Sequence, residues 1–132
     1  MTRRHMREQI FLMLFQREFH DLCDMDEQLE LYFDNLETPE SEEDIKLLIE
    51  RYKDVASKLG EIDMFIADSA TGWKLNRMGK VDLTILRLAV YEIKFDEETP
   101  NKVAVNEAVE LAKNYGGNAS SGFINGVLAK MI

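Results

Sequence analysis

The sequence predicts an all-α protein of about seven helices, and two observations support this fold class. Apolar residues recur at three- and four-residue spacings along the chain, and no stretch sustains the two-residue period of a strand. The 132 residues include only seven glycines and two prolines, which leaves little loop material. Because 45% of the residues are hydrophobic, we expect one compact domain over 1–132, made of two packed helical subbundles of roughly 1–71 and 72–132.

The first three predicted helices begin at residues that cap helices. Thr2 caps a helix that runs to about Phe19 and carries its large apolar residues on one broad side. A short second helix over 26–36 ends before a Thr-Pro pair. Ser41, followed three residues later by an acid, resembles a capping box and opens a third helix, for which Gly60 is the expected C-cap.

The middle of the chain contains the helix that we expect to be most buried. A short fourth helix over 62–70 precedes an irregular connection, in which Trp73 is expected to fill a gap between helices. The following segment, 82–95, is apolar on nearly all sides, which predicts a central position. Within it, Arg87 and Glu92 must be paired if they are buried, because an isolated interior charge is very costly.

Two further helices complete the predicted set. Thr99 and Pro100 are the expected N-cap and first position of a sixth helix, which Gly116 ends. Ser120 or Ser121 then caps a final helix that continues almost to the end of the chain.

The acidic residues are concentrated in one segment. The chain has 25 Asp and Glu against 16 Lys and Arg, a net charge of −9, which by itself argues against a nucleic-acid partner. However, residues 24–50 contain eleven acids and one base, so the rest of the chain is nearly neutral. We interpret this acidic segment as a solvated face, which leaves room for RNA binding elsewhere.

Compartment and chemistry are constrained mainly by what the sequence lacks. Cys23 is the single cysteine, and we expect it in the core. We also expect a reducing, cytoplasmic location, because one cysteine cannot form an internal disulfide and no leader or membrane-spanning run is recognisable. His5 and His20 are fifteen positions apart, and no metal-ligand spacing or phosphate-binding glycine loop occurs. We therefore predict a protein that is not an enzyme, with no cofactor, no metal and no membrane partner.

Two basic groups are the candidate binding residues. Arg3, Arg4 and Arg7 share the start of the first predicted helix, where their guanidinium groups can contact neighbouring phosphates or stack on unpaired bases. A second group, Lys74 and Arg77, lies in the irregular connection. Solvated surface charge is the alternative for both groups, and whether they converge in space is open.

Three segments carry a family resemblance: VDLTILRLAVYEI at 81–93, VAVNEAVELAK at 103–113 and FINGVL at 123–128. Together with the arginine-rich start, they resemble the NusB family of bacterial transcription antitermination factors. The resemblance covers essentially the whole chain and implies an all-α fold of two three-helix subbundles.

The resemblance also implies partners and site residues. Family members pair with NusE, a small-subunit ribosomal protein, bind the boxA element of ribosomal RNA leaders and thereby act on elongating RNA polymerase. The positions that match the family's RNA-contacting residues are Arg3, Arg4, Arg7, Ser120, Ser121 and Phe123, and Asp82 matches a position implicated in NusE contact. Whether Phe123 is exposed or part of the core stays open.

A different class of function is the alternative. The chain would then be a helical adaptor that binds a protein partner near Asp82 and makes no RNA contact of its own. Homodimerisation in the absence of a partner is also open, because exposed apolar surface can pair with itself.

Overall fold

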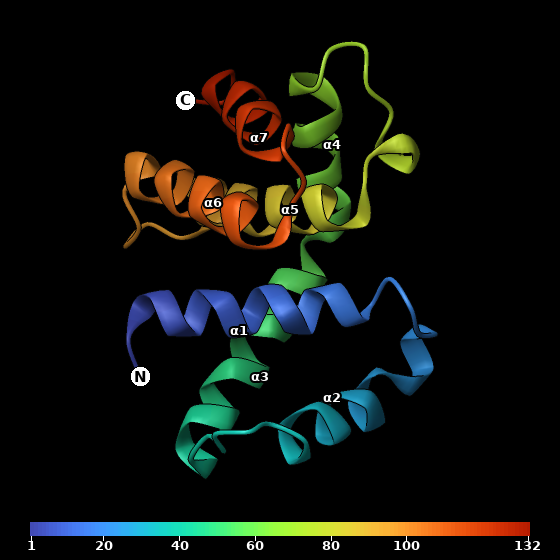
Figure 1. Ribbon diagram of the computed structural model, residues 1–132, viewed down its shortest axis with the longest axis vertical. Helices are drawn as coiled ribbons and strands as arrows, with labels where there is room; N and C mark the ends of the chain where they lie inside the picture. Colours follow the sequence, from blue (N-terminus) through green and yellow to red (C-terminus); the bar gives the residue numbers. More distant parts are fainter. The chain divides into compact units, whose positions relative to one another are not determined.

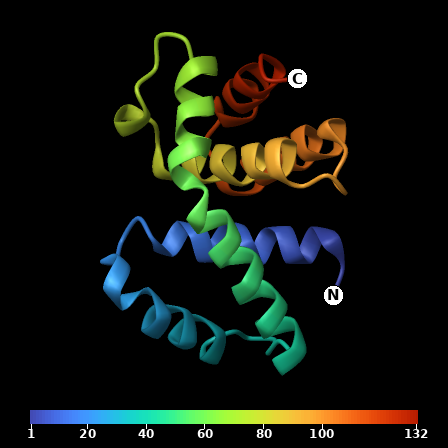
Figure 2. The same cartoon turned by 180° about the vertical axis from the view of Figure 1, so that it is seen from behind.

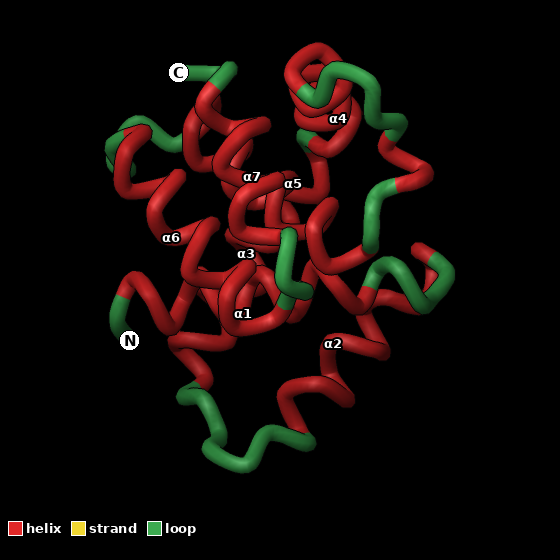
Figure 3. The backbone as a smooth tube through the Cα atoms, turned by 45° about the horizontal axis from the view of Figure 1, so that its top comes forward, coloured by secondary structure: helices red, strands yellow, loops and turns green.

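The computed structural model describes residues 1–132, and every regular element in it is a helix (Figure 1). The same chain drawn as a tube shows helices joined by loops (Figure 3). The predicted all-α class and the number of α-helices are confirmed. The elements in chain order are α1 (Arg3–Gln16), η1 (Leu22–Asp24), α2 (Met25–Asp34), α3 (Glu42–Ser57), α4 (Leu59–Ser69), η2 (Leu75–Arg77), α5 (Lys80–Phe95), α6 (Asn101–Tyr115) and α7 (Ser120–Ala129).

The chain divides into two compact units, Met1–Ala56 and Ser57–Ile132. The sequence placed the division later, near Gly72, and the structure differs because of α4. This helix completely buries Ile62 and Ile66 and packs against α5, so it belongs with the helices that follow it.

The first unit consists of α1, η1, α2 and α3, and α1 crosses α3 in both views (Figures 1 and 2). The Thr2 hydroxyl accepts a hydrogen bond from the His5 N–H at 3.1 Å, and Ser41 Oγ accepts one from the Asp44 N–H at 3.1 Å. Both predicted N-caps are therefore confirmed. The buried apolar residues come from all three α-helices and include Ile10, Phe11, Met13, Leu14, Leu29, Phe33, Leu48, Tyr52 and Val55.

Helix α5 is the central element of the second unit, where it packs against α4, α6 and α7. Ile85, Leu86 and Val90 have no exposed surface, because α4, α6 and α7 together cover most of the helix around them. The prediction that this segment is central and mostly buried is confirmed.

The two charged residues within α5 that were singled out from the sequence, Arg87 and Glu92, both have partners. Arg87 forms a bidentate pair with Asp63 of α4, with Nε 2.9 Å from Oδ1 and Nη2 3.0 Å from Oδ2. Glu92 is buried and also has a partner within the chain. Both expectations are confirmed, and the Arg87 pair joins α4 to α5.

Two predicted helix ends in the middle of the chain were wrong, at α3 and at α6. Gly60 does not end α3, because α4 begins at Leu59 and places Gly60 in its own first turn. Thr99 does not cap α6, because its hydroxyl instead donates to Asp96 Oδ2 at 2.7 Å, and Pro100 takes the N-cap position.

The predicted position of Cys23 was also wrong. This residue is exposed rather than part of the core. It lies in the three-residue helix η1, none of whose residues is buried. A surface turn between α1 and α2 therefore keeps the thiol in contact with solvent.

Candidate nucleic-acid interface

The arginine group lies on the first two turns of α1. Arg3 and Arg4 are exposed, and Arg7 is partly exposed one turn after Arg3. The buried stripe of α1 begins only at Gln9, so the arginines precede the part of the helix that packs into the core. The three guanidinium groups therefore occupy one end of the first unit.

The local electrostatics of this helix start favour an anion. The first turn of α1 contains no acidic residue, and the unpaired N–H groups of a helix start carry partial positive charge. His5, between the arginines, contacts the side chain of Glu40 and so ties this end of α1 to the loop before α3. Arg4 and Arg7 also have contacts within the chain. A helix start with three guanidinium groups can hold phosphate oxygens by charge-assisted hydrogen bonds, which for these two arginines would add to or replace their contacts within the chain.

A second candidate surface lies on the second unit, at the turn after α4. The Trp73 N–H donates to the Ala70 carbonyl at 3.0 Å, which closes the turn, and Gly72 has a φ of +83° within it. Because this left-handed conformation favours glycine, the turn depends on Gly72. The turn leaves 56% of the Trp73 surface exposed to solvent.

Trp73 packs against Phe123 of α7 in an edge-to-face pair. The ring centroids are 5.3 Å apart and the ring planes make an angle of 64°. Phe123 is partly exposed, which answers the question that the sequence left open: its ring lies at the edge of the unit beside Trp73. The two residues are 50 positions apart in sequence, and the packing of the second unit brings them together.

The sequence interpretation of Trp73 was wrong, because this residue is exposed and does not fill a gap between helices. A usable signal was present in the sequence. Trp73 is the only tryptophan, and it stands between a turn glycine and Lys74 in a basic connection. An aromatic residue among bases in a loop is a pattern typical of single-stranded nucleic-acid binding.

Lys74 and Arg77, the second predicted basic group, are both exposed. Lys74 directly follows Trp73 and precedes η2, and Arg77 is the last residue of η2. The connection therefore presents an aromatic ring and two cations within five consecutive residues.

The two serines before Phe123 differ in their surroundings. Ser120 is buried, and its Oγ accepts a hydrogen bond from the Gly117 N–H at 3.0 Å. A Cβ added at Gly116 would lie 2.6 Å from Ser120 Oγ, so the backbone and this hydroxyl are packed closely. Ser120 therefore shapes the turn into α7 and is not its N-cap, a position that Ala119 takes, while Ser121 is partly exposed.

Asp82, the predicted partner-binding residue, lies in the first turn of α5 and is partly exposed. A carboxylate there is favourable for the helix, because the start of a helix carries partial positive charge. The position suits both a structural role and a contact to a partner.

Comparison with known proteins identifies the family. The model of the NusB family matches residues 4–132. The chain belongs to the NusB family. Transcription antitermination protein NusB of Lachnoclostridium phytofermentans is 56% identical over 134 residues, an alignment that covers 100% of this chain and 99% of the relative. The protein of the same name from Agathobacter rectalis is 52% identical over 130 residues, covering 98% of each chain.

A solved structure supports the same assignment. The structure of NusB from T. maritima matches this NusB-family chain with a TM-score of 0.82 and 34% identity, covering 99% of this chain and 90% of the other. The predicted NusB-like fold and the predicted family are confirmed.

Membership of the NusB family settles the class of function. NusB proteins are transcription antitermination factors and not enzymes, which confirms the predicted non-enzymatic role in transcription antitermination. In this NusB-family chain, no helix is long and apolar enough to cross a membrane, and no group of three His, Cys, Asp or Glu side chains is placed to hold a metal ion.

Proposed function

We propose that this NusB-family chain acts in the cytoplasm as an antitermination factor that binds boxA RNA of ribosomal RNA leader transcripts together with NusE and so promotes read-through by RNA polymerase. Family membership supplies the antitermination role. The observation that carries the RNA contact is the exposed Trp73 ring, supported edge-on by Phe123 and followed directly by Lys74.

The proposal involves two kinds of contact, one to backbone phosphates and one to unpaired bases. Arg3, Arg4 and Arg7 hold backbone phosphates, and Lys74 and Arg77 do the same beside the aromatic pair. Phosphate contacts position a nucleic acid, while stacking on aromatic rings selects unpaired bases. The exposed Trp73 provides such a ring, its partner Phe123 lies on α7, and the partly exposed Ser121 of α7 is included in the proposed surface.

NusE completes the binding unit in this proposal. The arginine group neutralises only about two or three phosphates, and its contribution to affinity falls as the salt concentration rises. A partner that binds RNA at the same time raises the effective concentration of the second contact. We propose Asp82, at the start of α5, as a contact to NusE.

The proposal is tested by fluorescence anisotropy of labelled boxA RNA against a scrambled RNA of equal length. The protein is titrated alone and with NusE, at two salt concentrations. We expect binding selective for boxA that NusE strengthens. If NusE binds this chain but RNA affinity never exceeds that of NusE alone, the chain is a protein-binding adaptor without direct RNA contact.

Replacement of Trp73 by leucine is expected to weaken boxA binding by about tenfold, since stacking of one base on an aromatic ring contributes roughly 1–3 kcal/mol. Because Trp73 is exposed, the fold should remain intact, which far-UV circular dichroism checks. Tyr115→Leu, at an exposed aromatic at the end of α6, is the matched control and should leave affinity within about twofold. Equal losses in the two variants would contradict a specific role for Trp73.

A further inference from the structure

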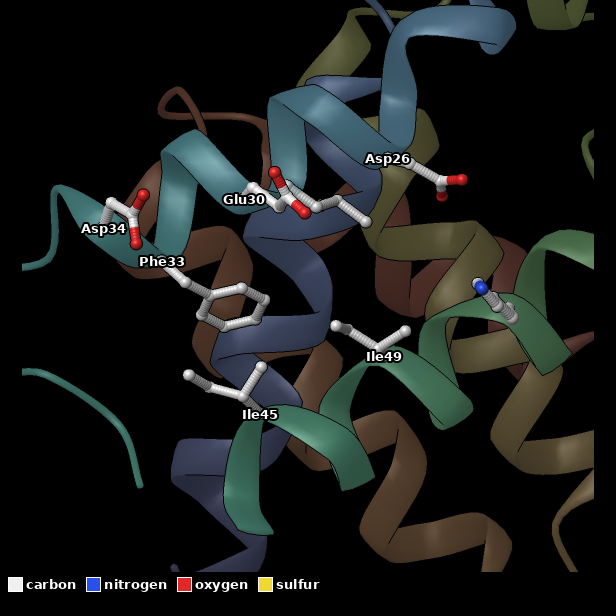
Figure 4. Close-up of a pocket in the computed structure, with 8 residues that line it drawn as sticks. Asp26, Glu30, Phe33, Asp34, Ile45 and Ile49 are labelled. Atoms are coloured by element: carbon white, nitrogen blue, oxygen red, sulfur yellow. The ribbon is translucent and has the colours of Figure 1, made fainter. Parts of the chain in front are cut away.

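A hollow of about 530 Å³ lies between α2 and α3 in the first unit. Its apolar residues come from both helices: Leu29 and Phe33 from α2, and Ile45 and Ile49 from α3. Figure 4 shows the Phe33 ring pointing from α2 towards Ile45, with Ile49 further along α3. Ile45 and Ile49 keep part of their surface exposed, so the two helices leave an apolar groove between them.

The rim of this groove is acidic along α2. Asp26, Glu30 and Asp34 line it, each exposed and each four residues from the next, so that they follow one side of the helix over about 12 Å. Figure 4 shows the three carboxylates spaced along α2. Lys53 of α3 is the single base in the lining.

Helix stability explains only part of this arrangement, because Asp26 lies in the first turn of α2, where the helix dipole favours a carboxylate, whereas Glu30 and Asp34 lie beyond it. Asp34 is the last residue of the helix, where the helix dipole disfavours a carboxylate, and α2 contains no basic residue. None of the three rim carboxylates has an ion-pair partner within the chain. Their charge is therefore available to a binding partner.

We propose that this groove binds a basic amphipathic helix of a protein partner. Apolar side chains on one face of that helix enter between Phe33 and Ile49, and Lys or Arg side chains spaced one turn apart face the rim carboxylates. This arrangement combines apolar burial with charge complementarity, which is the usual way in which a groove takes a helical segment. The proposal uses none of the residues in the proposed RNA surface, so the two can fail independently.

Two features favour a helix over other occupants. An extended peptide binds best by adding a strand to the edge of a sheet, and every regular element of this chain is a helix. The carboxylates also repeat with the period of a helix turn, which a neighbouring helix with bases at the same period matches over its length. A nucleic acid is disfavoured because its phosphates would face three carboxylates.

The test measures anisotropy of a labelled synthetic helical peptide with Leu at three- and four-residue spacings and Lys at every fourth position along one flank. A scrambled peptide of the same composition is the first control. We expect the patterned peptide to bind at least tenfold more tightly than the scrambled one, with affinity falling as salt rises. Amide shift changes in a two-dimensional NMR spectrum of the labelled protein should map to α2 and α3.

Variants then distinguish binding in the groove from attraction of the basic peptide to negative charge elsewhere on the protein. D26N/E30Q/D34N should weaken binding of the patterned peptide at least tenfold. The control E61Q/E97Q/E98Q removes the same charge at exposed residues of the second unit and should change affinity by less than twofold. Ile49→Ser, confirmed as folded by thermal denaturation, should also lose at least tenfold, because it weakens the apolar contact without altering charge.

Several outcomes would overturn the proposal. Equal binding of patterned and scrambled peptides, equal losses in the two charge variants, or shift changes outside α2 and α3 would each do so. Light scattering adds one more: self-association that D26N/E30Q/D34N abolishes would assign the groove to a second copy of this chain instead of a partner helix.

Discussion

Replacing Arg3, Arg4 and Arg7 by glutamine is expected to weaken boxA binding by about a hundredfold at 0.1 M salt. If the three guanidinium groups neutralise three phosphates of a single strand, their removal makes the plot of log affinity against log salt shallower by about 2. Over one decade of salt concentration, a difference of about 2 in this slope corresponds to the hundredfold loss of affinity. Anisotropy titrations at several salt concentrations measure both quantities. Glutamine keeps a similar helix propensity, so α1 should remain folded.

The matched control removes the same number of charges elsewhere. Lys46→Gln, Lys102→Gln and Lys113→Gln together change three exposed cations on α3 and α6. This variant should reduce affinity by less than threefold and leave the salt slope nearly unchanged. If the arginine variant behaves like this control, α1 is not part of the RNA-binding surface.

Leu86→Ala is expected to reduce the free energy of unfolding by about 3 to 5 kcal/mol, because the leucine side chain has no exposed surface and its removal leaves a cavity inside the second unit. The midpoint of thermal unfolding should fall by roughly 10 to 20 °C. Trp73, the single tryptophan, lies in the same unit and reports its unfolding by fluorescence.

Met64→Ala provides the comparison for this loss of stability. Met64 is on α4 in the same unit, and 69% of its surface is exposed. Its truncation should change the free energy of unfolding by less than about 0.5 kcal/mol. A similar small change for Leu86→Ala would mean that α5 is not the centre of a packed core.

The helices and their order were predictable because each follows from local chemistry. The three- and four-residue spacing of apolar residues identified every α-helix, and hydroxyl caps at Thr2 and Ser41 marked two of the starts correctly. The apolar character of α5 on nearly all sides predicted its central position, since a helix that is apolar around most of its circumference must be covered by others.

The same local rules failed where the tertiary structure gave a residue a different partner or environment. The hydroxyl of Thr99 binds the Asp96 carboxylate instead of capping α6, and Gly60 is taken into the first turn of α4. Cys23 and Trp73 were placed in the core on their apolar character alone, yet both lie on exposed turns. The apolar character of a residue does not determine whether the fold buries it.

For the candidate site, the sequence revealed the types of residue but not which residues lie next to one another in the folded protein. The arginine-rich start and the basic connection can be read from a local run of letters, because their members are adjacent in sequence. The pair of Trp73 with Phe123 and the groove between α2 and α3 join residues that are distant in sequence. Such contacts depend on how helices pack within each unit, which spacing along a single helix does not encode, so only the folded chain reveals these two surfaces.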